Sequence, residues 1–457
     1  MNVTTATTPP VFDLEVDTLI IGAGACGLVA ALSAREAGQS VLVLEADAVP
    51  SGSTALSAGL IPAAGTHLQQ KAGIKDSAQQ FFNDIQAKAK GENNEAVVAA
   101  LTKDAHTVID WLMCQYQLPF SLVDNFDYPG HSQRRMHGLP ARSGAELIDA
   151  LRSACETENI DIACNRRANT LYKEKLDITG VGVITSSGES ESIGCEKLIL
   201  ACNGFGGNRR MVQQHLPDIA NGVWFGHNGN QGEAMLWGDK LGAKLSHMSA
   251  YQGHGNVAHP HGILITWAVI TQGGIQVNRN GCRFWDESQG YSEAARAVLS
   301  QPGGEAITIF DKRIASVARQ FEDFKQAEIS GAVKQADSVA ELAALFSLPT
   351  QALLDTVQRL SMDGDDEFGR TFTGSVLTAP FYAVKVTGAL FHTQGGLEVN
   401  ECGRVIHQSG ELFSNLYAGG GAACGVSGNG DSGYLSGNGL LSAVVLGFNA
   451  GKDEVVS

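Results

Sequence analysis

The chain has 457 residues, 44% of them hydrophobic and 18% charged, so it is long enough for two hydrophobic cores and has the composition of a globular protein. Its formal net charge of −16 argues against nucleic-acid partners and against anionic membrane surfaces. Its apolar runs are too short for a membrane span, so none is expected.

The first elements predict a βαβ unit. Residues 17–22 (DTLIIG) are an apolar run ending in glycine, which is typical of a buried parallel strand. Residues 25–37 are rich in alanine and are followed by Gly38, which predicts a helix with a glycine stop. A second buried strand is predicted at 41–45. This order favours the α/β class with an open parallel sheet.

The rest of the chain alternates between helical and extended patterns. Helices are predicted over most of 76–117, at 144–158, 232–242 and 311–360, and from Gly437 onward, and strands at 181–202 and 381–420. The stretch 247–290 is rich in histidine, glycine and aromatic residues, and we expect it to be irregular and to belong to the active site.

The nine cysteines are scattered without CxxC or CxxCH spacing, so no metal site and no attached haem are expected. An unpatterned set of this kind is typical of reduced thiols. The N-terminus lacks the basic and apolar regions of a secretory signal. These features predict a cytoplasmic location.

A GxGxxG motif joins the first strand to the first helix. Gly22 permits the tight turn, Gly24 lets the backbone approach a pyrophosphate, and Gly27 lets helix and strand pack closely, with Ala25 and Cys26 between them. The N–H groups at the start of the helix favour a diphosphate. The motif therefore predicts a dinucleotide site.

Glu45 ends the second strand, at the distance expected for the acid that binds ribose hydroxyls, and Ala46 follows it. The fingerprint and this acid do not distinguish NAD from FAD.

Three later segments favour FAD: SGSTALSAG at 51–59, LILACNGFGG at 198–207, and LYAGGGAACGVSGNGDSGYLSGNGLLSAVVLG at 416–447. With these segments, in this order over nearly the whole chain, the sequence resembles the flavoproteins of the fumarate reductase/3-ketosteroid dehydrogenase family. The resemblance implies non-covalently bound FAD in a Rossmann-type domain, 1–245 plus 386–457, with an α+β capping domain inserted at 246–385. It implies further cofactor contacts at Ser53, Thr54, Ser57, Ala58, Gly59, Gly204, Gly420, Asn438, Gly439, Leu440 and Leu441.

The last helix has a physical role in this interpretation. A helix that starts near Gly437 directs N–H groups toward the flavin pyrimidine ring and raises its electron affinity. The family often has a glutamate where this chain has Gly421, so the contact of that glutamate with the cofactor has to come from another residue.

Two tyrosines occupy positions that define the substrate in this family. Fumarate reductases have arginines at the places of Tyr291 and Tyr434, whereas ketosteroid dehydrogenases have tyrosines. The resemblance implies that Tyr291 removes the proton next to a carbonyl, that Tyr434 donates a hydrogen bond to the carbonyl oxygen, and that flavin N5 takes the β-hydride.

Two histidines instead resemble those of fumarate reductases. His392, in FHTQGG, resembles the histidine of HTMGG, and His254, in QGHG, resembles that of QAHP. A small cyclic ketone bearing a carboxylate would suit both tyrosines and histidines.

The sequence therefore predicts FAD-dependent desaturation of a small-molecule ketone. The alternative is an ene-reductase or a fumarate reductase-like enzyme that runs the reverse reaction. A non-catalytic FAD carrier is disfavoured, because a cap is needed to exclude water around a substrate. The electron acceptor is left open between a quinone, a carrier protein and oxygen.

Overall fold

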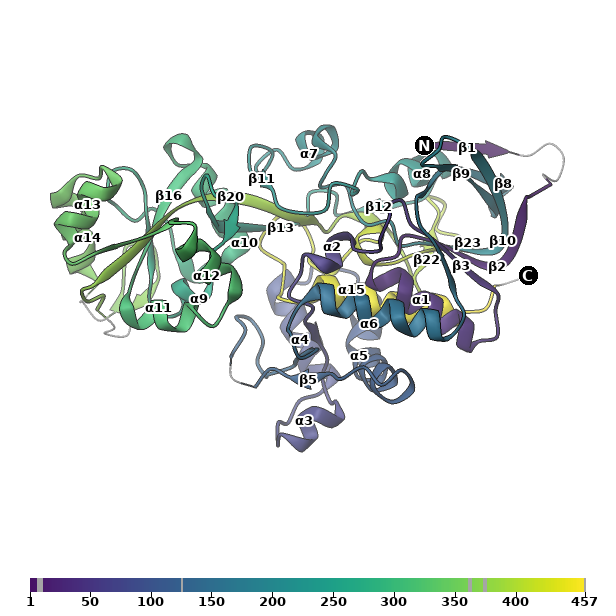
Figure 1. The fold of residues 1–457 in the computed structure, drawn as a ribbon, viewed down its shortest axis with the longest axis horizontal. Coiled ribbons are helices and arrows are strands. Elements are labelled where there is room, and N and C mark those ends of the chain that lie inside the picture. The colour runs from purple at the N-terminus through teal and green to yellow at the C-terminus, as the bar shows by residue number, and fades with distance from the viewer. Residues whose placement is uncertain (6–10, 125, 361–363, 373–375, 456–457) are drawn as a thin grey trace. The chain divides into compact units, whose positions relative to one another are not determined.

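The computed structural model describes residues 1–5, 11–124, 126–360, 364–372 and 376–455, which fall into two compact units (Figure 1). The first unit comprises 1–215, 226–251 and 392–457, and the second 216–225 and 252–391. The sequence predicted the changes of domain after residues 245 and 385, a few residues before each of these boundaries. It did not separate the short segment 216–225.

The first unit has a large sheet with helices against it. Its helices are α1 (Ala25–Glu36), α2 (Gly52–Ala55), α3 (His67–Lys71), α4 (Ala78–Ala89), α5 (Glu95–Gln115), α6 (Gly144–Thr157), α7 (Arg209–His215), α8 (Glu233–Leu241), η3 (Gly420–Ala422) and α15 (Asn438–Lys452). Its strands are β1 (Asn2–Thr5), β2 (Leu14–Ile21), β3 (Val41–Leu44), β4 (Ile61–Pro62), β5 (Ser121–Leu122), β6 (Met136–Gly138), β7 (Asp161–Ala163), β8 (Arg166–Glu174), β9 (Asp177–Thr185), β10 (Ser190–Leu200), β12 (Leu245–Ser246), β21 (Gly396–Leu397), β22 (Arg404–Ile406) and β23 (Leu412–Ala418).

The main sheet of this unit has the order β1-β8-β9-β10-β2-β3-β7, with β23 beside β10 and β22 beside β23. β2 is parallel to both β3 and β10, and β10 is also parallel to β23. The last residues of β2, such as Ile20, are fully buried, as expected of a central parallel strand. The turn after β2 therefore lies at the carboxyl edge of the sheet, where doubly wound folds bind ligands.

Helices α1 and α15, from opposite ends of the chain, pack side by side in this unit (Figure 1). A Cβ on Gly447 would overlap the Cys26 carbonyl, and a Cβ on Gly451 would overlap that of Ala30. These pairings advance together along both helices, so α1 and α15 are parallel. Glycine is required here because backbone meets backbone.

The second unit is built on a mixed sheet with the order β14-β13-β20-β16-β15, to which β11 and β17 add at β20. Its elements are β11 (Val223–Trp224), β13 (Tyr251–Ala258), β14 (Ile263–Leu264), α9 (Ala268–Thr271), β15 (Ile275–Val277), η1 (Glu287–Gln289), α10 (Tyr291–Leu299), η2 (Pro302–Gly304), β16 (Glu305–Asp311), α11 (Lys312–Ala318), α12 (Glu322–Ile329), β17 (Val333–Ala336), α13 (Val339–Phe346), α14 (Thr350–Arg359), β18 (Gly364–Asp365), β19 (Thr371–Phe372) and β20 (Phe381–Thr393).

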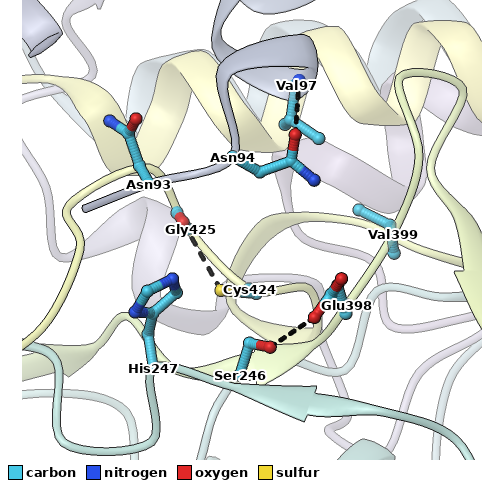
Figure 2. Close-up of a pocket in the computed structure, with 9 residues that line it drawn as sticks. All are labelled: Asn93, Asn94, Val97, Ser246, His247, Glu398, Val399, Cys424 and Gly425. Carbon is cyan, nitrogen blue, oxygen red and sulfur yellow. Dashed lines mark hydrogen bonds between the residues drawn. The ribbon is translucent and has the colours of Figure 1, made fainter. Parts of the chain in front are cut away.

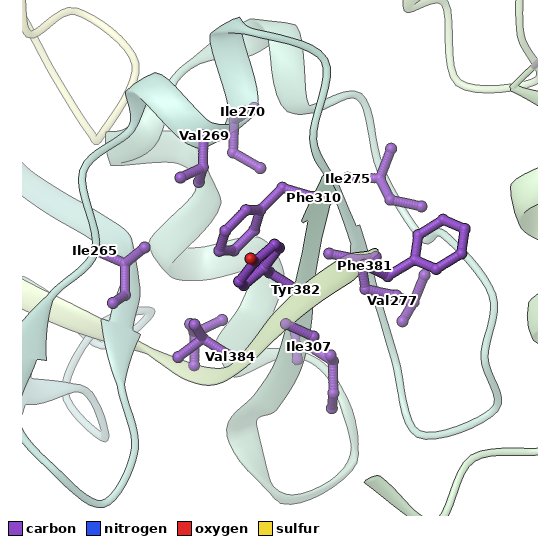
Figure 3. Close-up of a cluster of buried hydrophobic side chains, with 14 of the residues drawn as sticks. Ile265, Val269, Ile270, Ile275, Val277, Ile307, Phe310, Phe381, Tyr382 and Val384 are labelled. Atoms are coloured by element: carbon purple, nitrogen blue, oxygen red, sulfur yellow. The ribbon is translucent and has the colours of Figure 1, made fainter. Parts of the chain in front are cut away.

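Apolar side chains from β15, β16, β20 and α9 form the core of this unit (Figure 3). Phe310 and Tyr382 stack at its centre, with ring centroids 6.0 Å apart. The core fixes β13 and α10, which present the candidate site residues of this unit.

The stretch 247–290 is more regular than the sequence suggested, because it contains β13, β14, α9 and β15. The signal for β13 (YQGHGNVA) is weak, since small residues interrupt the usual apolar alternation. Gly255 shows why: a Cβ there would overlap the backbone and side chain of Ala294. Helix α10 therefore packs so closely on β13 that the strand has small residues where large apolar side chains would usually stand.

Helix packing in the first unit gives a first prediction. Gly447→Ala should lower the free energy of unfolding by roughly 2–4 kcal/mol, because the clash with the Cys26 carbonyl outweighs the better helix propensity of alanine. Gly38→Ala, where a Cβ enters open space, serves as the comparison and should cost only about 1 kcal/mol for its positive φ. Urea denaturation measures both, and an unchanged Gly447→Ala protein would contradict this packing.

Candidate functional site

The glycine-rich turn after β2 has the geometry of a dinucleotide site. Gly22 has φ +108°, and a Cβ there would lie 2.5 Å from the Ala201 carbonyl oxygen. A Cβ on Gly27 would overlap the Gly22 carbonyl. At Gly24, in contrast, the nearest atom to a Cβ is Thr54 Oγ1 at 3.6 Å. The first and third glycines are thus required by the fold, while the protein leaves space in front of the second.

The N-terminus of α1 faces this space with its N–H groups. Gly24 is the N-cap and has no capping side chain, and the first turn contains no acidic residue. The N–H of Ala25 donates to Thr54 Oγ1 (3.2 Å), and that of Leu28 makes the first intrahelical bond, to the Gly24 carbonyl. The amides of Cys26 and its neighbours supply the positive end of the helix dipole, which suits a diphosphate.

Glu45 is fixed beside the glycine turn. Its two carboxylate oxygens accept hydrogen bonds from the N–H groups of Ala23 and Asp47, each 2.9 Å long. The half-buried side chain is thus oriented at the end of β3, with exposed Ala46 following it. A contact of Glu45 with ribose hydroxyls stays a prediction.

The segment from Ser53 to Gly59 forms α2 and a tight turn. Ser57 Oγ donates to the Thr54 carbonyl (2.7 Å) and accepts from the Gly59 N–H (3.1 Å). Ala58 is the residue between Ser57 and Gly59 in this turn. Ser53 Oγ accepts from Asn230 Nδ2 (2.8 Å). The sequence gives no signal for buried Asn230, because this residue precedes α8 and lies far from the segment 53–59 along the chain.

The position of the missing family glutamate is filled by another side chain. A Cβ on Gly421 would overlap Oδ1 of Asn203, which accepts from the Gly204 N–H (2.8 Å). Asn203 has φ +64°, a conformation that asparagine tolerates better than most residues. Gly204 is also close-packed, because a Cβ there would overlap Thr393 Oγ1, whereas Gly420 is set apart by its φ of +57°. Asn203 is therefore the residue that occupies the expected place of the glutamate.

The N-terminus of α15 contains buried polar atoms without protein partners. Among the described residues, neither Oδ1 nor Nδ2 of Asn438 has a hydrogen bond, and Ser442 Oγ has none. Both residues are less than 5% exposed. Buried polar groups are rarely left unpaired, so these atoms indicate a bound polar molecule. Leu441 is buried beside them and Leu440 is half-buried.

The two helix N-termini are displaced along a common direction. The two helices are level where Gly447 of α15 packs on Cys26 of α1. From that level α15 extends nine residues back to its first residue, Asn438, whereas α1 extends only one, to Ala25. At the rise of an α-helix, α15 therefore begins roughly 12 Å beyond α1. An extended dinucleotide can place its diphosphate at α1 and its ring system at α15, so these residues fit such a cofactor.

His392 and Tyr434 lie together over the first turn of α15. Their rings are 5.2 Å apart, edge to face. A Cβ on Gly439 would lie 3.4 Å from His392 Nε2 and 3.6 Å from the Tyr434 hydroxyl. Burial raises the pKa of Tyr434 to about 12, opposed by the N–H groups of Gly439 and Gly437, and burial lowers the pKa of His392 to about 4. Both groups are therefore uncharged at neutral pH.

His254 and Tyr291 lie together in the second unit. The imidazole of His254 is stacked between the rings of Tyr291 and Phe391, each 5.2 Å away, with Trp267 at its edge. Burial lowers the pKa of His254 to about 3. The Asn256 N–H donates to His254 Nδ1 (3.2 Å), so the proton of this neutral ring is on Nε2.

A buried ion-pair network fixes the turn that precedes Tyr291. Glu287 is fully buried and binds Arg283 (2.5 Å), Arg370 (3.1 Å) and the N–H of Gln276 (3.0 Å). Tyr291 begins α10, and the hydroxyl of the next residue, Ser292, accepts from the N–H of Gly253 on β13. The arginine and glutamate of RFWDE are therefore structural and hold Tyr291 in place.

The first unit also contains a cavity of about 260 Å³ that the sequence analysis did not predict (Figure 2). It is lined by Asn93, Asn94, Val97, Ser246, His247, Glu398, Val399, Cys424 and Gly425. Glu398 in its wall is already paired with Lys244 and Ser246. In the part of the chain that the structure describes, no three metal-binding side chains form a cluster and no helix has the length and apolar character to cross a membrane.

Residues 17–440 match the model of the FAD-binding domain family. A probable fumarate reductase of Shewanella frigidimarina is 28% identical over 95% of this chain and 74% of its own length. The 4-oxocyclohexanecarboxylate 2-dehydrogenase of Sinomonas cyclohexanicum is 24% identical over 96% of this chain and 94% of its own. The chain spans only about half (47%) of larger relatives such as the NADH:fumarate oxidoreductase of Klebsiella pneumoniae.

Solved structures show the same fold. A flavocytochrome c3 fumarate reductase in its open conformation has a TM-score of 0.82 and 27% identity, covering 96% of this chain and 78% of that one. A 3-ketosteroid Δ4-(5α)-dehydrogenase from Rhodococcus jostii has a TM-score of 0.81 and 23% identity, covering 99% of both chains. The expected α/β fold, with a Rossmann-type FAD-binding domain and an inserted capping domain, is confirmed, and FAD is the cofactor.

The open space at Gly24 gives a second prediction. Gly24→Val should fold normally, since the protein leaves room for a side chain, but should lose FAD because the valine takes the place of the diphosphate. Ala37→Val, exposed at the other end of α1, should keep the cofactor. Flavin absorbance after gel filtration measures the bound FAD. If the Gly24→Val protein kept its full content of FAD, the diphosphate would not bind at this turn.

The buried histidines give a third prediction, on stability. The pKa of His254 in the fold lies below its ordinary value of 6.5, so the unfolded chain binds the proton first and stability falls as pH drops below about 6.5. His254→Gln should therefore reduce the loss of unfolding free energy between pH 7 and pH 5 by roughly 1–2 kcal/mol. His67→Gln, at an exposed site, should leave that loss unchanged. Equal losses in both variants would contradict a buried, neutral His254.

Proposed function

Because the chain belongs to the FAD-binding domain family, we propose that it is an FAD-dependent enzyme that converts a ketone into an α,β-unsaturated ketone. The observation that carries this proposal is the convergence of the Tyr434 hydroxyl and His392 Nε2 over Gly439, at the N-terminus of α15. Both groups are uncharged at neutral pH. Uncharged donors beside a helix N-terminus suit a carbonyl oxygen that gains negative charge during the reaction.

Uncharged groups favour a ketone over a dicarboxylate as substrate. Tyr291 and Tyr434 stand where the fumarate reductases that this chain resembles have arginines. A phenol polarises a carbonyl but provides no charge to pair with a second carboxylate. His254 and His392 resemble histidines that contact a substrate carboxylate in fumarate reductases. We therefore propose a small cyclic ketone that bears one carboxylate. A relative that is named for 4-oxocyclohexanecarboxylate supports this choice.

The reaction removes two hydrogens from neighbouring carbons. Bound FAD supplies the acceptor for the β-hydrogen, which leaves as a hydride. Tyr291, as phenolate, takes the α-proton onto its oxygen, and the electron pair of that C–H bond forms the new double bond. Tyr434 donates its proton in a hydrogen bond to the enolate-like oxygen, and His254 and His392 orient the substrate. The two electrons then pass to an acceptor that is a quinone, a carrier protein or oxygen.

The reverse reaction is the second candidate. The similarity to fumarate reductases favours a reductase that adds hydride and proton across a double bond. The same side chains serve both directions, with Tyr291 as acid in place of base. The redox partner then decides the direction.

The two tyrosines give a fourth prediction. Tyr291→Phe should slow flavin reduction by a cyclohexanone-type ketone roughly 10²–10⁴-fold, because the ring stays and the proton acceptor is lost. Tyr434→Phe should slow it roughly 10²–10³-fold through loss of the donor to the oxyanion. Both variants should retain FAD.

Anaerobic stopped-flow absorbance measures these rates. Tyr172→Phe, in the outer part of the main sheet, is the control and should react like the original protein. Near-normal reduction in Tyr291→Phe would exclude this residue from proton transfer and leave His254 and His392 as the candidates.

A further inference from the structure

We propose that Gln394, held by Ser427, fixes His392 as the neutral Nε2–H tautomer, so that this histidine is a hydrogen-bond donor and not a base. The inference concerns the imidazole itself, and only its consequence for catalysis rests on the proposed function. It assigns Gln394 and Ser427 as positioning residues.

The contacts form a short chain within the first unit. Gln394 Nε2 lies 2.8 Å from His392 Nδ1, and Ser427 Oγ donates to Gln394 Oε1 (2.9 Å). Both side chains are buried, with Ser427 only 1% exposed. His392 and Gln394 are two residues apart at the end of β20, and residues at this spacing in an extended segment point to the same side. The amide of Gln394 therefore reaches the imidazole without distortion.

The backbone of Gln394 is also fixed on both sides. Its N–H donates to the Ala250 carbonyl (2.8 Å), and its carbonyl accepts from the Gly425 N–H (2.7 Å). A Cβ on Gly425 would lie 2.5 Å from Gln394 Oε1. The segment from Cys424 to Ser427, which borders the cavity of Figure 2, is thus shaped around this amide.

These contacts determine the protonation of His392, because the Gln394 amide lies 2.8 Å from Nδ1, closer than the Thr393 carbonyl oxygen at 3.5 Å. A neutral imidazole has one N–H and one lone pair, and a nitrogen that accepts from an amide N–H must keep its lone pair. With the lone pair on Nδ1, the proton is on Nε2, the ring nitrogen that would lie 3.4 Å from a Cβ on Gly439. The amide also opposes a second proton on Nδ1. This agrees with the lowered pKa of His392, whose main cause is burial.

Gln394 sets this chain apart from the HTMGG motif that the segment resembles. Methionine in that position has no N–H to donate. His254 is fixed in the same tautomer by a different donor, the N–H of Asn256. The two histidines therefore present Nε2–H groups through independent contacts.

The tautomer can be read directly by ¹⁵N–¹H correlation spectroscopy of the oxidised, FAD-loaded protein labelled at histidine. The signals of His392 are identified from their loss in His392→Asn. They should show protonated Nε2 and unprotonated Nδ1 from pH 5 to pH 8. A protonated Nδ1 in the original protein would overturn the proposal.

Two variants test the role of Gln394. Gln394→Glu keeps the shape but accepts from Nδ1, so His392 should change to the Nδ1–H tautomer or become imidazolium. Gln394→Met removes the donor, so both tautomers should appear. Unchanged His392 signals in both would overturn the proposal. Gln79→Glu, exposed on α4, is the matched control and should leave these signals as they are.

The kinetic consequence is measured separately. Gln394→Glu should lower kcat/KM for the ketone roughly 10–100-fold, as loss of a supporting contact commonly does, with FAD still bound. If the tautomer changes as expected but no ketone reduces the flavin in the original protein, the assignment of Gln394 holds and the proposed function fails. If ketone is oxidised but the tautomer is Nδ1–H, the assignment fails alone.

Discussion

The packing of α15 on α1 is the contact on which the site depends. Backbone meets backbone at Gly447 and Gly451, so the two helices lie closer than side chains would allow. Because they are parallel and offset by roughly 12 Å, two helix N-termini point the same way at different depths. The N-cap residue of each helix is a glycine without a capping side chain, and neither first turn contains an acid. We propose that these two positive dipole ends bind the diphosphate and the flavin ring.

The second constraint is charge. The candidate substrate groups with a perturbed pKa, Tyr434, His392 and His254, are all uncharged at neutral pH, chiefly because of burial. A buried neutral donor stabilises a developing oxyanion without attracting a dianion in the ground state. An arginine would instead supply a positive charge that pairs with a second carboxylate. We therefore propose that the tyrosines direct the same fold toward ketones.

The sequence predicted the parts of the fold that rest on local patterns. The βαβ unit, the stop at Gly38 and the start of α15 at Gly437 were found within three residues, because glycine and apolar runs mark them. It missed β13, whose small residues are explained only by the helix packed on it. Asn203, Asn230 and Gln394 were missed for a related reason: their partners are distant in sequence, and amide side chains give no pattern of their own. The roles of Tyr291 and Tyr434 came from family resemblance alone.

The most direct test of the central claim is to mix the FAD-loaded protein, without oxygen, with three classes of substrate. These are cyclohexanone-type ketones including 4-oxocyclohexanecarboxylate, 3-ketosteroids, and succinate. Absorbance follows flavin reduction, and mass spectrometry follows the loss of two hydrogens. We expect a ketone to bleach the flavin and to yield the α,β-unsaturated product, whereas succinate should not react. Bleaching by succinate with no reaction of any ketone would contradict it.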